Sequence, residues 1–217
     1  MAAGTSGDSD TGRAGVRWRR FAAALGLTGT AAGALVLLTA QGVLAAQFSI
    51  SGMPFTVTAN KLTGTGFEQF ATIDEMIENS PNQGDTGGQV LVIVSAINKA
   101  ELTNLCQSVS LGGINLKITA GDAGTPVKGT NMVVDSANDQ TDPNSNAIQG
   151  DASFDDIDIG QDASTLNRVP GVKGGPGVFS QQARTVTIVN LRQRNYATTA
   201  AAFSLPHLRM KFTDSEC

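Results

Sequence analysis

The chain has 217 residues and a formal net charge of −4, with 16% charged and 5% aromatic residues. Residues 1–46 hold four of its 15 basic and two of its 19 acidic residues, which leaves residues 47–217 with 11 basic and 17 acidic residues, a net charge of −6. This acidic balance argues against nucleic acid as a partner, because a nucleic-acid-binding domain needs a basic surface. The abundance of Gly, Ala, Thr, Ser, Asn, Val and Ile is typical of a β-rich domain with many turns.

The N-terminus predicts export. Residues 1–20 are small, polar and basic, and we expect a disordered cytoplasmic tail. Residues 21–46 carry no charge and directly follow Arg17, Arg19 and Arg20, which fits a signal peptide cut before Ala46 or an uncleaved transmembrane anchor. Either interpretation places residues 47–217 outside the cytoplasm, at the cell envelope or secreted, because basic residues stay on the cytoplasmic side.

The exported part predicts mostly strands. Residues 48–57 suggest a first strand, and the spacing of three and four between Phe67, Phe70, Ile73 and Ile77 predicts a short amphipathic helix. Residues 89–94 form a continuous β-branched run, which predicts a strand buried on both faces. Short alternating segments then continue to Phe212 and predict strands with one buried face.

A degenerate internal repeat lies among these strands. Residues 102–107 (LTNLCQ) align with residues 188–193 (IVNLRQ), and each block is followed by another alternating segment. Repeated strand–turn units without helices suggest stacked rungs or a duplicated sheet. Chance similarity between two amphipathic strands is the alternative.

Charge is segregated along the chain. Residues 135–162 hold eight aspartates and no Lys or Arg, whereas residues 168–213 hold seven basic residues and no acid. We expect the two segments to neutralise each other when packed. The alternative is a calcium-binding face beside a face for anionic headgroups. Its candidate residues are Asp156, Asp158 and Asp162 for calcium and Arg192, Arg194, Arg209 and Lys211 for headgroups.

The reactive side chains are few. Cys106 and Cys217 form an even pair in a chain expected to be exported, which permits a disulfide that would attach the tail to the body; two free thiols are the alternative. The single histidine, His207, is expected to lie on a strand surface. The sequence contains no G-x-S-x-G motif, P-loop or dinucleotide-binding glycine motif, so we assign no catalytic residue and no cofactor.

Three stretches carry a family resemblance: residues 102–109, 158–164 and 196–200. With them, the chain resembles an actinobacterial family of exported proteins of unknown function whose members are often labelled cholesterol esterase. The resemblance covers residues 21–46 and most of residues 47–217, and it implies no catalytic residues.

The sequence therefore predicts one elongated, mainly β domain, built as an irregular β-helix or as an open sheet or sandwich, behind a signal or anchor helix. Thr- and Ala-rich strands with few aromatic residues favour an open, groove-like or stacked core over a dense globular one. The expected function is that of a non-enzymatic envelope protein that binds a lipid, another apolar molecule or a membrane-protein partner. A self-assembling surface protein and a lipid or sterol esterase are the alternatives, and the first of these would form homo-oligomers.

Overall fold

The computed structural model describes residues 49–84, 87–139 and 145–217. The predictions for the tail (1–20) and for the signal or anchor segment (21–46) lie outside this part of the chain. Within it, no helix combines the length and the apolar character that a membrane crossing requires.

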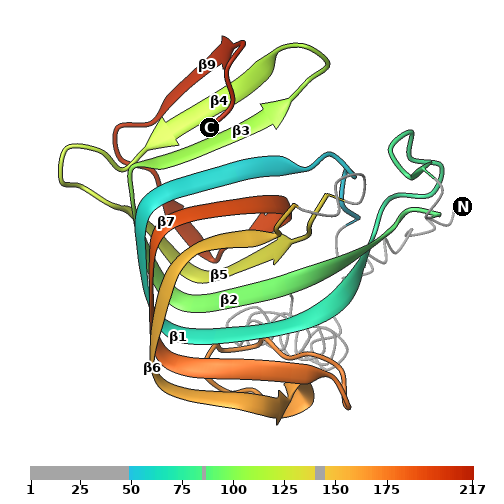
Figure 1. Ribbon diagram of the computed structural model, residues 1–217, viewed down its shortest axis with the longest axis vertical. Helices are drawn as coiled ribbons and strands as arrows, with labels where there is room; N and C mark the ends of the chain where they lie inside the picture. The colour runs from blue at the N-terminus through green and yellow to red at the C-terminus, as the bar shows by residue number, and fades with distance from the viewer. Residues whose placement is uncertain (1–48, 85–86, 140–144) are drawn as a thin grey trace, which may run out of the picture. The chain divides into compact units, whose positions relative to one another are not determined.

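The described residues form one antiparallel sheet, which confirms the predicted mainly β domain (Figure 1). Between named strands every pairing is antiparallel, so the sheet alternative describes the fold, not the stacked parallel rungs of a β-helix. The strands are β1 (Phe55–Glu75), β2 (Gln89–Thr103), β3 (Leu105–Ser110), β4 (Asn115–Ala120), β5 (Val127–Ser136), β6 (Ile148–Asp162), β7 (Phe179–Thr199), β8 (Ala202–Ser204) and β9 (Arg209–Thr213).

Four of these strands close into a ring. β7 pairs with β1, β1 with β2, and β2 with β5. The last residues of β7 then pair with β5, where Val133 lies opposite Thr199 and Ser136 opposite Asn195. β6 pairs with the rest of the same edge of β7. The sheet therefore encloses an interior instead of stacking on a second layer.

Long strands can close in this way because neighbouring strands bend at residues that lie opposite one another in the sheet. In one row across the sheet, Gly150, Asn190, Asn60 and Asn104 lie opposite one another on β6, β7, β1 and the β2–β3 junction. Three of them have positive φ, at 146°, 55° and 53° for Gly150, Asn190 and Asn104. Gly and Asn are the residues that adopt this left-handed region most readily.

A second row lies six residues further along β1. Asp156, Arg184, Gly66, Asn98 and Asn131 are opposite one another on β6, β7, β1, β2 and β5. Asp156, Gly66 and Asn131 have positive φ, at 55°, 66° and 46°, so every second strand carries the irregular residue. Figure 1 shows the result: β1, β6 and β7 curve back on themselves, with an upper arm, a back and a lower arm.

The internal repeat corresponds to the first row. Leu102 and Ile188 flank Leu62 on its two sides, so residues 102–107 and 188–193 run along opposite edges of β1 at the same level. The shared Asn occupies the same bend in both copies. The similarity therefore reflects a common bend in one sheet, not two stacked units.

Two sequence predictions in this region are wrong. Residues 67–75 belong to strand β1, not to a helix. Phe67 packs in the core cluster on the inner face, and Phe70 packs in a second cluster on the outer face. Because both faces of β1 are covered here, apolar residues occur on both, and their spacing of three resembles that of an amphipathic helix. The second wrong prediction is that the strand at residues 89–94 is buried on both faces. Leu91 and Ile93 are 67% and 37% exposed, so only one face of this strand is buried.

The outer face of the lower arm is covered by residues 163–178. Leu166 and Val169 of this segment are almost completely buried. Glu68 of β1 is also buried, and its Oε1 accepts hydrogen bonds from the backbone N–H groups of Arg168 and of Val169, the latter at 2.8 Å. Burial raises the pKa of Glu68, against the lowering effect of these two hydrogen bonds. Glu68 therefore attaches the segment to the sheet.

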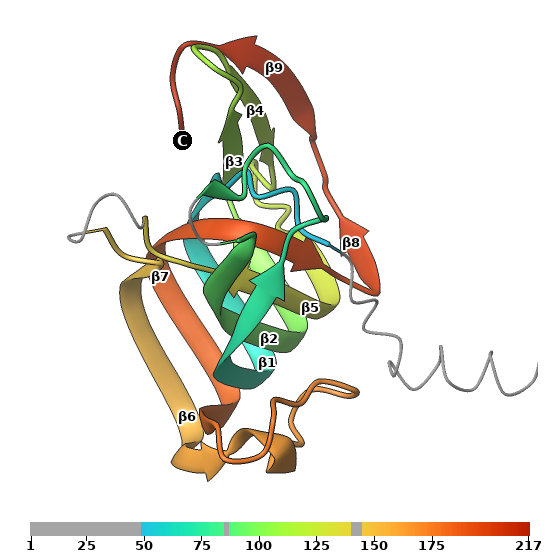
Figure 2. The ribbon, with the colours of Figure 1, turned by 90° about the vertical axis from the view of Figure 1, so that its right-hand side faces the viewer.

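β3, β4 and β9 form a three-stranded wing above the folded strands in both ribbon views (Figures 1 and 2). β3 continues the sheet from β1, β4 pairs with β3, and β9 pairs with β4. A disulfide joins Cys106 of β3 to Cys217, with Cα atoms 5.8 Å apart. The C-terminal residue is thereby attached to the middle of the chain.

An uncharged cavity as the candidate functional site

The folded sheet encloses a cavity of about 970 Å³. Its walls come from the inner faces of β1, β2, β5, β6 and β7, the start of β3, and residues near β8 and Ile50. Of the two kinds of core that the sequence favoured, groove-like or stacked, the cavity fits the open, groove-like one.

The back wall and part of the lower wall are apolar. Leu62, Leu102 and Ile188 line the cavity at the level between the two bends, and Met132 and Phe67 continue the wall along the lower arm. The rings of Phe67 and Phe154 pack with centroids 5.2 Å apart. These residues also belong to the main core cluster or pack against it, so the apolar wall is part of what stabilises the fold.

Polar side chains occur at the two arms, and all of them are uncharged. On the lower arm Gln181 Nε2 donates to Gln69 Oε1 at 2.6 Å, and Gln69 Nε2 donates to Ser95 Oγ at 2.9 Å. On the upper arm Ser136 Oγ donates to Asn195 Oδ1 at 2.7 Å. No Lys, Arg, His, Asp or Glu is among the lining residues of the described chain.

The cavity is open to solvent at its rim. Ile93 on β2 is 37% exposed and Phe203 on β8 is 43% exposed, although both line the cavity. Gln149, Ala152 and Thr198 are exposed lining residues as well. A molecule can therefore reach the interior without unfolding the ring.

The proposed headgroup arginines do not face this cavity. Gln193 and Asn195 line it, so Arg192 and Arg194, which alternate with them along β7, point to the opposite face. There they line a smaller hollow of about 390 Å³. Arg192 Nη1 donates to the carbonyl oxygen of Cys217 at 2.8 Å, and Arg194 pairs with Asp139 at 3.5 Å.

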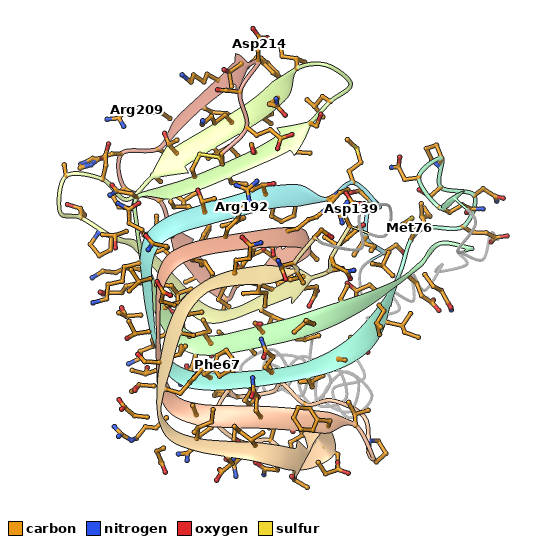
Figure 3. The ribbon with its side chains drawn as sticks, in the orientation of Figure 1. Phe67, Met76, Asp139, Arg192, Arg209 and Asp214 are labelled. Carbon is orange, nitrogen blue, oxygen red and sulfur yellow. A yellow bond between two sulfur atoms is a disulfide. The ribbon has the colours of Figure 1, made fainter. Side chains whose placement is uncertain are left out.

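Arg209 and Lys211 lie elsewhere, on β9 in the wing. Arg209 pairs with Asp122 at 2.6 Å, and the hydrogen bonds from Arg209 and His207 lower the pKa of Asp122. Figure 3 shows Arg209 beside the outer part of the wing, apart from Arg192. The four basic residues therefore do not form a single surface.

The three calcium candidates have other partners. Asp156 pairs with Arg168 at 3.0 Å and with Arg184 at 3.9 Å, and Asp158 accepts a hydrogen bond from Gln182 Nε2 at 3.2 Å. Asp162 caps the short 3₁₀ helix at Ala163–Thr165, and hydrogen bonds from Ser164 and from the N–H of Gly177 lower its pKa. The described residues contain no group of three or more His, Cys, Asp or Glu side chains placed to hold a metal ion.

The segregated charges neutralise each other, as expected. The pairs of Asp156 with Arg168 and Arg184, and of Asp139 with Arg194, each join the acidic segment to the basic one. Pairing of β6 with β7 brings the two segments together. These contacts are surface-exposed to a large extent, so each contributes modestly to stability.

His207 lies in a turn before β9 with φ of 55°, not on a strand. Its Nδ1 is 2.7 Å from Asp122 Oδ1. The prediction of a strand position is wrong because Pro206 precedes it and the chain must turn from β8 to β9.

Sequence reasoning did not locate the cavity, because its lining residues come from seven strands, β1, β2, β3, β5, β6, β7 and β8. One signal was available in the sequence. Some strand positions that face inward carry an uncharged polar side chain where an apolar one is usual, namely Gln69, Ser95, Gln107 and Gln193. An alternation pattern marks a face as buried, but it does not show which inner faces meet.

A profile of the family of unknown function DUF6230 matches residues 51–217. No curated protein and no solved structure matches the chain.

Proposed function

We propose that this chain, which belongs to the family of unknown function DUF6230, is a non-enzymatic protein that binds an uncharged apolar molecule in the cavity of its folded sheet. The observation that carries the proposal is a cavity of about 970 Å³ whose described lining has no charged side chain.

The size and composition of the cavity support binding. Small-molecule sites have volumes of about 300–1,000 Å³ and are mostly apolar with a few polar groups that orient the ligand. The lining here has that character, with Leu62, Leu102 and Met132 along its walls and amides at its arms. Removing apolar surface from water, worth roughly 25 cal/mol per Å², would be the main source of affinity.

The chemistry of the lining favours binding over hydrolysis. A hydrolase that uses a serine nucleophile needs a base beside it, and the described lining contains neither a histidine nor a carboxylate. His207 is bonded to Asp122 at the β8–β9 turn and is not a lining residue. This argues against the alternative function of a lipid or sterol esterase.

As part of this proposal, the protein is located at the cell envelope. The support for this location is the sequence of residues 17–46, where arginines precede an uncharged stretch. An extracytoplasmic binding protein would hold an apolar molecule away from water between the membrane and its destination.

The experiment compares two neighbouring residues of β6. Ala152 lines the cavity, whereas Ser153 faces the other way; both are exposed. We expect Ala152→Trp to fill the cavity mouth and to abolish retention of apolar molecules that co-purify with the full-length chain, measured by solvent extraction and mass spectrometry. Ser153→Trp should retain them at the level of the unmodified protein.

Both variants should have the same unfolding midpoint in urea as the unmodified chain to within a small shift, because both positions are at the surface. Equal retention by the two tryptophan variants, or no apolar molecule in the unmodified protein even after it is offered a long-chain ester, would contradict the proposal.

A further inference from the structure

Three inward-facing polar residues form a chain of hydrogen bonds across the lower arm of the cavity. Gln181 on β7, Gln69 on β1 and Ser95 on β2 lie directly opposite one another, so their side chains share a face. Gln69 and Ser95 line the cavity, together with Phe67 and Ile97 of the same strands.

The hydrogen bonds of this chain have a direction. Gln181 donates to the Gln69 oxygen, and Gln69 donates to the Ser95 oxygen. A serine hydroxyl also has one hydrogen to donate, and no acceptor for it occurs among the hydrogen bonds of the described residues. Ser95 is only 5% exposed. The chain therefore ends in a buried donor at the cavity wall.

A second polar side chain without a hydrogen-bond partner lies on the upper arm. Gln193 is 7% exposed as a residue and lines the cavity. Its amide makes no hydrogen bond within the described part of the chain, although the flanking Arg192 and Arg194 make several. The amide atoms of Gln193 are not among the buried side-chain atoms that lack a partner, so they are accessible from the cavity and can bond to water or to a ligand.

We infer that the cavity selects an uncharged molecule with a hydrogen-bond-accepting oxygen, and that Ser95 and Gln193 donate to this class of ligand. This rests on the proposed function. The apolar walls surround a long hydrocarbon part, and the two donors give hydrogen bonds to an ester, ether or hydroxyl oxygen, which accepts them. An anionic headgroup is excluded from the cavity, since no cation among the described lining residues would offset the loss of its hydration.

The test uses three probes with the same hydrocarbon length: a fatty acid methyl ester, the corresponding alkane and the corresponding free acid in its ionised form. Binding of each labelled probe to the immobilised full-length chain is measured, at a pH well above the pKa of the acid. We expect the ester to bind about fivefold more tightly than the alkane, the effect of one net hydrogen bond. It should bind at least about tenfold more tightly than the carboxylate.

The variant Ser95→Ala/Gln193→Leu should lose the preference for the ester over the alkane but keep its affinity for the alkane, which also shows that it is folded. Gln89→Leu, which changes an exposed amide of β2 that does not line the cavity, is the matched control and should keep the preference.

Equal affinity for the carboxylate and the ester, or an unchanged ester preference in the double variant, would overturn the inference and leave the proposed function standing. Failure of the unmodified chain to bind any of the three probes would overturn the proposed function as well.

Discussion

Asp135 is the residue whose ionisation is most strongly affected by the fold. It lies on β5 opposite Val94 and Ala197, on the face that points away from the cavity. Burial, together with the nearby charge of Asp74, raises its pKa from 3.8 to about 7. Burial also raises the pKa of Asp74. Both carboxyl groups are therefore held by the fold in a setting that favours their neutral form.

This predicts a pH-dependent stability. The folded state binds the Asp135 proton more tightly than the unfolded state, so the free energy of unfolding decreases as the pH rises from 3.8 to about 7. Asp135→Asn cannot ionise, and we expect it to flatten this part of the pH profile and to raise stability above pH 7. Urea unfolding at several pH values measures both effects. A variant with the same slope as the unmodified chain would contradict the assignment to Asp135.

At the scale of the element, the bends matter most. A strand that stayed straight would continue past the enclosed space, but the two rows at Asn60 and Gly66 turn β1 twice within a few residues. The rows pass through neighbouring strands at the same level, so the bends are correlated across the sheet. The cavity is a consequence of where Gly and Asn are placed.

Gly66 provides a test of this argument. It has φ of +66°, and an added Cβ would lie 2.5 Å from the carbonyl oxygen of Arg168. Gly112, in the β3–β4 turn, has φ of +77° with nothing within 4 Å of the added atom. Gly112→Ala should cost about 1 kcal/mol through backbone strain alone. Gly66→Ala should cost about 2–4 kcal/mol, because the clash adds to the strain.

Urea unfolding of the two glycine variants gives the comparison. An equal loss in the free energy of unfolding for both variants would mean that the backbone of residue 168 can move away from Gly66. That would contradict the attachment of this backbone by Glu68.

At the scale of the whole molecule, one covalent bond links distant parts of the sheet. The Cys106–Cys217 disulfide spans 111 residues. Lys117 Nζ and Asn115 Nδ2 of β4 also donate to backbone carbonyls near the C-terminus, at 3.0 and 3.4 Å. The tail is thus attached to both β3 and β4, and it follows β9, which pairs with β4.

Removing the disulfide should destabilise the chain. Restriction of the unfolded state by a cross-link is worth about 2–4 kcal/mol in typical proteins, and about 4–5 kcal/mol for a loop of this span. We expect Cys106→Ser/Cys217→Ser and reduction of the unmodified protein to lower the free energy of unfolding by similar amounts. An unchanged urea midpoint after reduction, with both thiols shown to be free by mass spectrometry, would rule this out. Ligand retention should persist, because neither cysteine lines the cavity.

The sequence alone determined the properties that depend on composition and local pattern. Alternation between apolar and polar residues predicted strands, and Thr- and Ala-rich strands with few aromatic residues favoured an open, groove-like or stacked core over a dense one. The pairing of acidic and basic segments was also predictable, because opposite charges in adjacent long strands meet. The expectations for residues 1–46 rest on sequence alone.

The tertiary structure decided which strand faces meet and hence where the site is. Phe67 and Phe70 show why: their spacing is compatible with a helix, and only the cover on each side of β1 makes it a strand. Ser95 and Gln193 are 98 positions apart in a sequence that gives no sign of their relation, and they line one cavity because β7 returns to pair with β1 and β5. Ring closure is a long-range property, set by the register and the bends of several strands together.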